Sequence, residues 1–380
     1  MDIESDGRMK KDLSTVKMAH VSPNARKDSS SFIKAHLSGI MCSVIHYHEG
    51  YLPRLKEEEA IHPLPFFHKV VFKFFRSWRG LNRAEYQLML QFKQDNIQLI
   101  FAEYGPTGAA LQSLAKKLKI PLIVHFHGFD AHHRATLGKY KKGYQPFLSD
   151  GSKVIAVSQL MQQQIISWGM REENILYSPC GCDPKFVQTP IPSERSGFIA
   201  VGNFVPKKGP LKTIQSFALA RQMGCSASLT MVGDGPLLKE CQEWVMEHQL
   251  QDSILFTGAL SHGDTFEKLN KSLVFLQHSI TPEDGNKEGT PVAILEAQGL
   301  GLAVVSTRHA GIPDVVIEDK TGILVEEGDT EGMAHAILAL WQDQDFAKQL
   351  GKQGRERVQN NYTIAHHLAK INQLIESSLR

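Results

Sequence analysis

Two glutamates separated by seven residues stand in the segment EGTPVAILEAQG, residues 288–299. Thr290 favours a helix N-cap and Pro291 the first helical position, so Glu288 precedes the predicted helix and Glu296 lies within its first two turns. Helical spacing would separate the two carboxylates by about 12 Å on nearby faces. They can therefore accept hydrogen bonds from two polyols of one extended ligand, with an anion favoured at the helix N-terminus between them.

A second segment that suits a phosphate ligand is VGNFVPKKGP, residues 201–210. It follows a predicted strand and offers a glycine turn at Gly202, then Lys208 and Gly209 just before a predicted helix. A lysine there presents a compact positive charge to a diphosphate. The Walker pattern GxxxxGK[ST] is absent, so the segment is either a different kind of phosphate loop or a surface turn with a solvated lysine.

A histidine-rich run, HFHGFDAHH at residues 125–133, suggests an alternative chemistry. His125 and His127 alternate at a predicted strand end, with His132 and His133 following, and alternate strand residues face the same side. That spacing can bind a divalent metal, as in a metal-dependent hydrolase, or it can leave His125 bonded to backbone within the sheet. The second-half strands end in VGN, VGDG and TGA, which suit phosphates better than metals.

A third class of protein, a dinucleotide-dependent oxidoreductase, is suggested by Gly233–Asp234–Gly235. The GxGxxG fingerprint requires a third glycine, but Pro236 and Leu237 follow instead. A lone GxG does not identify such an enzyme.

Short apolar runs alternate with helical patterns along the chain, which places these motifs at strand ends. This order predicts right-handed βαβ units and parallel sheets, hence an α/β fold. The predicted strands are Val16–Val21, Met41–His48, Ile97–Tyr104, Pro121–Phe126, Lys153–Val157, Asn174–Tyr177, Gly197–Val201, Ala227–Val232, Ile254–Thr257, Leu273–Gln277, Ala303–Ser306 and Gly322–Val325.

A linker divides the chain into two predicted domains. Residues 187–197, VQTPIPSERSG, contain two prolines and charges without periodicity. The boundaries are then a loose tail over residues 1–15, a first domain over 16–188 and a second over 196–380. The last helical pattern either finishes the second domain or crosses back onto the first.

Composition and charge narrow the class of protein. The 380 residues suggest two domains at roughly 150 residues each. A net charge of +2 is too small to indicate a nucleic-acid partner. The five cysteines form no CxxC pair and the N-terminus has no secretory pattern, which predicts free thiols in the cytoplasm. No apolar run approaches the roughly 20 residues that span a bilayer.

Taken together, the motifs resemble glycosyltransferase family 4, retaining enzymes of the GT-B architecture. The similar segments are VGNFVPKKG (201–209), LTMVGDGP (229–236), ILFTGAL (254–260), EGTPVAILEAQGLGLAVVSTRHAGIPDVV (288–316), PLIVHFHGFD (121–130) and ILYSPCGCDPKF (175–186). The 288–316 segment contains the EX7E signature of that family. The chain looks closest to exopolysaccharide enzymes of the colanic-acid type. The resemblance implies two Rossmann-like doubly wound domains with a cleft between them.

In the second domain, the resemblance implies a donor site for a nucleotide sugar. Lys208, in the same loop as Asn203, would bind the diphosphate. Glu288 would hold sugar hydroxyls, and Glu296 would bind the ribose diol. The remaining donor contacts would come from the backbone of Gly289 and Thr290.

In the first domain, His127 would meet the donor sugar near the reacting carbon, and Asp130 would orient His127 or bind acceptor. The catalytic set is then His127, Glu288 and Lys208. The implied activity is hexosyl transfer with retention, to a carbohydrate or lipid-linked acceptor and without a metal or other cofactor. Lys208 and a helix N-terminus can stabilise the departing diphosphate without Mg²⁺. No residue decides among UDP, GDP and ADP donors.

The sequence departs from the family pattern at two places. The usual arginine five residues before the lysine is Asn203 here, which leaves open an impaired sugar-nucleotide binder unless Lys207 or Arg308 substitutes. The glycine-rich turn after the first strand is also missing, because residues 22–32 read SPNARKDSSSF. That second departure bears on acceptor binding.

Residues 66–79, FFHKVVFKFFRSWR, set an apolar helical face beside a basic remainder. Such a helix either packs on the first sheet or lies in a membrane interface, attracted to anionic lipid. The second alternative predicts weak peripheral binding at the inner membrane face.

Overall fold

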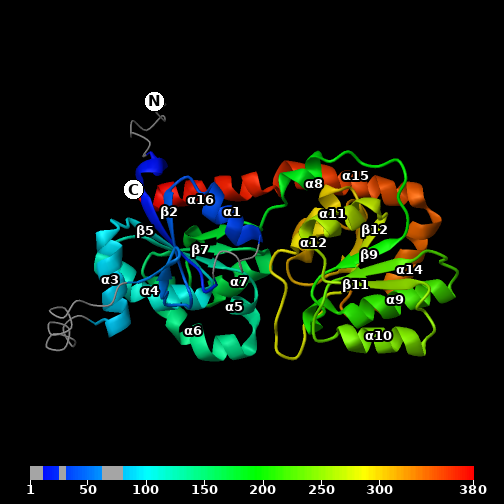
Figure 1. Ribbon diagram of the computed structural model, residues 1–380, viewed down its shortest axis with the longest axis horizontal. Coiled ribbons are helices and arrows are strands. Elements are labelled where there is room, and N and C mark those ends of the chain that lie inside the picture. The colour runs from blue at the N-terminus through cyan, green and yellow to red at the C-terminus, as the bar shows by residue number, and fades with distance from the viewer. Residues whose placement is uncertain (1–11, 25–30, 62–79) are drawn as a thin grey trace.

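The computed structural model describes residues 12–24, 31–61 and 80–380. Within them the chain forms two α/β units, each with its own sheet, and Figure 1 shows the units side by side along the long axis. The predicted interfacial helix at 66–79 lies outside the described residues, as do residues 1–11 of the predicted tail.

The first sheet has eight strands in the order β4-β3-β2-β1-β5-β6-β7-β8. An antiparallel hairpin of two short strands closes one edge, and the other strands are parallel. Strand order reverses between β1 and β5, and ligands bind at such switch points. The strands are β1 (Lys17–Val21), β2 (Ser43–His48), β3 (Leu55–Lys56), β4 (Glu59–Ala60), β5 (Leu99–Glu103), β6 (Leu122–Phe126), β7 (Lys153–Ala156) and β8 (Ile175–Tyr177).

Helices cover this sheet and carry its crossovers. In chain order they are η1 (Leu13–Thr15), α1 (Ser31–Gly39), α3 (Arg83–Gln94), α4 (Gly105–Leu118), α5 (Phe129–His132), α6 (Arg134–Ser149), α7 (Gln159–Ser167) and η3 (Glu172–Asn174). The next helix, α8 (Pro184–Gln188), already packs on the second unit. Because both sheet faces are covered, the central strands β5 and β6 are buried throughout and mostly apolar.

The second sheet has six parallel strands in the order β11-β10-β9-β12-β13-β14. Its switch point lies between β9 and β12, so the loops after these two strands are placed to bind a ligand. The strands are β9 (Phe198–Val201), β10 (Leu229–Val232), β11 (Ile254–Gly258), β12 (Val274–Gln277), β13 (Ala303–Thr307) and β14 (Ile323–Val325). The helices of this unit are η4 (Pro206–Lys208), α9 (Pro210–Gln222), α10 (Leu238–Glu247), α11 (His262–Lys271), α12 (Val292–Gly299), α13 (Ile312–Val315), α14 (Thr330–Gln342) and α15 (Gln344–Asn361), and α16 (Ile364–Ser378) follows them in the chain.

Each of the twelve predicted strands is present, with its ends within two residues of the prediction. The parallel α/β class is confirmed with them. The sequence did not indicate the hairpin β3–β4, because strands of two residues carry no periodicity.

The last two helices join the units. Helix α15 ends in the second unit, and α16 lies over the first, as the red helix in Figure 1 shows. Ile371 and Ile375 of α16 are buried in one apolar cluster with Met18 of β1. The Met41 N–H also donates to Asn372 Oδ1 at 3.0 Å. The C-terminal helix therefore belongs to the packing of the first unit.

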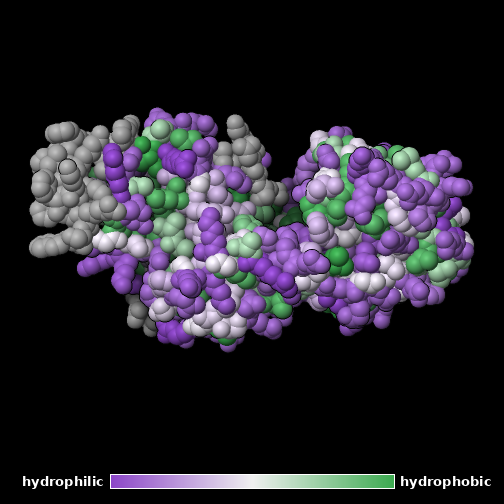
Figure 2. All heavy atoms as spheres, turned by 90° about the horizontal axis from the view of Figure 1, so that it is seen from below, coloured by the Kyte–Doolittle hydropathy of each residue, from purple (hydrophilic) through white to green (hydrophobic). Residues whose placement is uncertain are grey.

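The outer surface shows no sign of a membrane-spanning element in the part of the chain that is described. None of the described helices is both long enough and apolar enough to cross a bilayer. Figure 2 shows two lobes joined at a narrower waist, with mainly hydrophilic residues on this face.

Candidate active site between the two units

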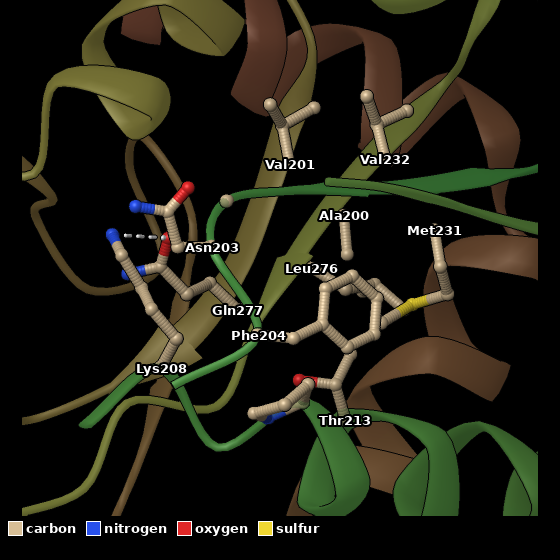
Figure 3. Close-up of a pocket in the computed structure, with 12 residues that line it drawn as sticks. Ala200, Val201, Asn203, Phe204, Lys208, Thr213, Met231, Val232, Leu276 and Gln277 are labelled. Carbon is tan, nitrogen blue, oxygen red and sulfur yellow. Dashed lines mark hydrogen bonds between the residues drawn. The ribbon is translucent and has the colours of Figure 1, made fainter. Parts of the chain in front are cut away.

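Lys208 stands at the switch point of the second sheet. It ends the short helix η4, and Gly209, with φ +51°, lets the chain turn directly into α9. A side chain on Gly209 would meet the His278 carbonyl oxygen, its Cβ lying 2.1 Å away, so glycine is required. Figure 3 shows the lysine extended past Asn203, with its Nζ 3.4 Å from Gln277 Oε1 at the end of β12.

Glu288 faces Lys208 and is nearly buried, with 4% of its surface exposed. Lys208 Nζ lies 3.2 Å from Glu288 Oε1, and Lys207 Nζ lies 4.0 Å from Oε2. Burial would raise the pKa of Glu288, but the two lysines outweigh it and lower that pKa. Oε1 accepts no well-aligned hydrogen bond from the described protein groups. A charged, buried carboxylate that is held by a lysine and still has acceptor capacity at Oε1 can take ligand hydroxyls.

The backbone of Glu288 is fixed by a pair of side chains that sequence reasoning missed. Glu288 N–H donates to His309 Nε2 at 3.1 Å. His309 Nδ1 lies 2.6 Å from Glu327 Oε1, which holds the ring in place. His309 belongs to the HAGIPDVV stretch, so its place in a recognised motif was the available signal.

The two units touch where His127 approaches the Glu288 loop. A Cβ on Gly289 would lie 2.3 Å from the His127 carbonyl oxygen, and one on Gly128, with φ +139°, 3.0 Å from the Lys287 carbonyl oxygen. Only glycine at both positions permits this approach. The structure therefore brings His127, Glu288 and Lys208 to one place between the sheets.

Thr290 acts differently from the prediction. The expected N-cap is wrong, because α12 starts at Val292 with Pro291 in the cap position and no side-chain cap bond. The Thr290 hydroxyl instead accepts the Cys180 N–H at 2.8 Å and donates to the Val157 carbonyl at 3.0 Å. A tertiary contact across the units thus replaces the local cap.

Glu296 lies apart from Lys208, further along α12. Its carboxylate is 3.3 Å from His262 Nε2, and its side chain is 13% exposed. It lines a pocket that also includes Lys34 and Ser38 of α1 and Asp183. Exposed ion pairs of this kind contribute little free energy, so Glu296 can exchange His262 for a ligand at low cost.

His127 is held by Glu103, a buried residue that the sequence did not single out. His127 Nε2 lies 2.6 Å from Glu103 Oε2 at the end of β5. Burial would lower the pKa of His127, but hydrogen bonds to Cys180 and Glu103 raise it to about 10. The raised pKa favours the protonated imidazole, whose side chain is 6% exposed.

Asp130 is fully buried and accepts three backbone N–H groups. They come from Gly105 at 3.0 Å, His127 at 2.9 Å and Gly128 at 2.9 Å. Burial raises the pKa of Asp130. With no exposed surface, its carboxylate can shape the His127 loop but cannot reach an acceptor.

The position of the missing arginine is exposed. Asn203 lies beside Lys208 at the rim of the pocket in Figure 3. Arg308 is engaged elsewhere, by Glu318 and by Glu326 at 3.3 Å. Between Lys207 and Arg308, the two residues that could replace the charge of the missing arginine, Lys207 is the one that lies near Glu288.

The GxG pattern has a packing role. A Cβ on Gly233 would lie 2.0 Å from the Gly202 carbonyl oxygen, and one on Gly235 2.7 Å from that of Phe204. These glycines let the loops after β9 and β10 touch. Among the described residues, these glycines give no support to the oxidoreductase, whereas His125 and His127 do belong to groups that could hold a metal ion, as the hydrolase alternative requires.

Comparison with known proteins gives the class. The chain superimposes on Anabaena Alr3699/HepE in complex with UDP with a TM-score of 0.75, at 16% identity, over 95% of this chain and 100% of that one. The two units are thus the Rossmann-like domains of the GT-B fold, as predicted.

Family models match most of the chain. Glycosyltransferase Family 4 matches residues 39–186, and Glycosyl transferases group 1 matches residues 183–357. The putative colanic acid biosynthesis glycosyltransferase WcaL of Escherichia coli is 29% identical over 79% of each chain. The amylovoran biosynthesis glycosyltransferase AmsK of Erwinia amylovora is 27% identical over 72% of this chain and 69% of its own. The chain belongs to glycosyltransferase family 4.

Proposed function

We propose that this glycosyltransferase moves a hexose from a nucleoside diphosphate sugar to a carbohydrate or lipid-linked acceptor, with retention of anomeric configuration. The bond from the anomeric carbon to phosphate breaks and a bond to the acceptor hydroxyl oxygen forms on the same face. The products are the glycoside, the nucleoside diphosphate and a proton. The relatives named for colanic acid and amylovoran biosynthesis support a role in exopolysaccharide synthesis.

The observation that carries this proposal is the meeting of Lys208 and Glu288 with His127 between the two sheets. Lys208 supplies charge for a diphosphate, and Glu288 Oε1, 3.2 Å from Lys208 Nζ, can also accept a sugar hydroxyl. The His127 cation approaches from the other unit. Departure of a diphosphate develops negative charge that these cations stabilise.

A nucleotide-sugar screen tests the class. UDP is the first nucleotide to try, because the HepE structures contain UDP and UDP-glucose. We expect one nucleoside diphosphate to raise the melting temperature and its sugar to be transferred with an unchanged anomeric proton coupling in the product. An inverted product would contradict retention and leave the transferase class intact.

Lys208→Ala should weaken nucleoside diphosphate binding far more than nucleoside binding. Loss of a charged hydrogen bond costs about 1.5–3 kcal/mol, or roughly 10- to 150-fold in affinity. Calorimetry with the diphosphate and the nucleoside separates the two effects. In this metal-independent proposal, added Mg²⁺ or Mn²⁺ changes neither affinity nor turnover; an absolute requirement for either ion would contradict it.

Glu296→Ala should weaken binding of the whole nucleotide, because the ribose diol would lose a charged hydrogen-bond acceptor. Such a hydrogen bond contributes about 1.5–3 kcal/mol to binding. His262→Ala is the matched control, since it removes only the present partner of Glu296. Equal nucleotide affinity in the wild type and in Glu296→Ala would remove Glu296 from the donor site.

The basic and apolar segment 66–79 supports a cytoplasmic, membrane-peripheral location. We expect weak binding to anionic vesicles at low salt, reduced when Lys69, Lys73, Arg76 and Arg79 become glutamine. Vesicle sedimentation measures this binding in the wild type and in the glutamine variant. An unbound wild type at low salt would favour an acceptor that is not lipid-linked.

A further inference from the structure

Three buried histidines converge beneath the His127 loop from distant parts of the chain. They are His36 of α1, His125 of β6 and His367 of α16. All three are buried, and one nitrogen of each ring lies within 4.8 Å of one nitrogen of the others. Helices α1 and α16 thus place His36 and His367 beside His125 of the first sheet.

The spacing of the three rings fits coordination of one metal ion. Ring centroids are 5.1 Å apart for His36 and His125, 5.1 Å for His36 and His367, and 5.5 Å for His125 and His367. A zinc–nitrogen bond of about 2.1 Å sets each ring centre about 3.2 Å from the ion, and tetrahedral angles then separate ring centres by about 5 Å. The three rings match this arrangement.

Second partners orient two of the rings toward that centre. His36 Nδ1 lies 2.7 Å from Glu103 Oε1, and His367 Nδ1 lies 2.7 Å from Ser178 Oγ. The Nε2 atoms of both rings consequently face inward, 2.9 Å apart. Metal-bound histidines are typically held this way, with the other nitrogen on a carboxylate or another polar group. The buried Glu103 charge also offsets that of a cation.

His125 supplies the independent observation. It is fully buried, yet neither ring nitrogen has a hydrogen-bond partner among the described residues. Its Nδ1 is 3.5 Å from Glu103 Oε2, too distant for a good bond. A buried polar ring without a well-aligned partner is unfavourable, and an additional ligand would satisfy it.

We propose that His36, His125 and His367 bind one divalent transition-metal ion, zinc by preference, which ties α1 and α16 to strand β6. Imidazole nitrogens suit zinc, and three histidines would leave the fourth position of a tetrahedral ion to water or another small ligand. This proposal revises the expectation that the chain holds no metal. The site would use neither Lys208 nor Glu288, although it shares Glu103 with His127.

The alternative is that a shared proton, and not a metal ion, lies between the rings. An N–H···N hydrogen bond between His36 and His367 accounts for their 2.9 Å separation, but it leaves His125 unexplained. The two alternatives differ in metal content, so elemental analysis separates them.

The test uses the full chain, purified without added metal. We expect about one zinc per chain, lost in His36→Gln and in His367→Gln and retained in His335→Gln, a control on the exposed face of α14. The metal-free wild type should bind Co²⁺ with visible absorption typical of a tetrahedral site, and zinc should raise its melting temperature.

Two results would overturn the proposal. One is a wild type without zinc that shows no change with Zn²⁺ or Co²⁺; this result needs no variant to fold. The other is unchanged stoichiometry in folded His367→Gln. Calorimetry with UDP runs in parallel: a chain that fails both metal tests but binds UDP would lose the metal site and keep the proposed function.

Discussion

Glu288→Gln should abolish sugar transfer while preserving the affinity for free nucleoside diphosphate. The amide keeps the volume of the side chain but removes the charged acceptor proposed for the sugar hydroxyls. It also leaves Lys208 and Lys207 without the carboxylate that now faces them. With one negative charge fewer at the site, a diphosphate should bind as well or more tightly. Turnover should fall about 100-fold or more.

The matched control is Glu318→Gln, which removes a partly exposed carboxylate paired with Arg308. That variant should transfer sugar like the wild type. Calorimetry with nucleoside diphosphate and a transfer assay at saturating donor give the two quantities. If Glu288→Gln lost diphosphate affinity and turnover in proportion, Glu288 would serve nucleotide binding rather than the sugar.

His127→Ala should also reduce transfer by about 100-fold, again with unchanged nucleotide binding. His127 belongs to the first unit, whereas Lys208 and Glu288 belong to the second. Its cation therefore contributes only when the sugar lies between the units. His335→Ala, on the exposed surface of α14, controls for the loss of a histidine.

A melting curve must accompany the His127 variant, because Glu103 loses a hydrogen-bond partner with it. The informative comparison is turnover against nucleotide affinity in the folded protein. Turnover close to that of the wild type would show that His127 is dispensable and that Glu103 holds it for structural reasons.

The sequence was sufficient for the framework of the site. Parallel strands buried on both faces read as apolar runs, so each strand and the loop that follows it could be located. Lys208 lies between a strand and a helix as predicted, because a glycine turn fixes that loop locally. Local chemistry determines such features.

The remaining features depend on contacts between distant residues. Thr290 has the local signature of a cap, yet its hydroxyl joins Cys180 and Val157 of the other unit. Glu103 ends strand β5, and no neighbouring residue in the sequence identifies it as functional. It contacts His36 and His127 because the fold brings residues that are distant in the chain together. Hydrophobic periodicity in a single sequence predicts local elements, but it does not predict contacts between distant residues.

The most direct test of the central claim is the release of nucleoside diphosphate from a panel of nucleotide sugars. The assay compares the wild type with Glu288→Gln and His127→Ala, in the presence of acceptor extracts. We predict that the wild type releases diphosphate from at least one donor, and that both variants release about 1% as much or less. Undiminished release by both variants would contradict the placement of the sugar between Glu288 and His127.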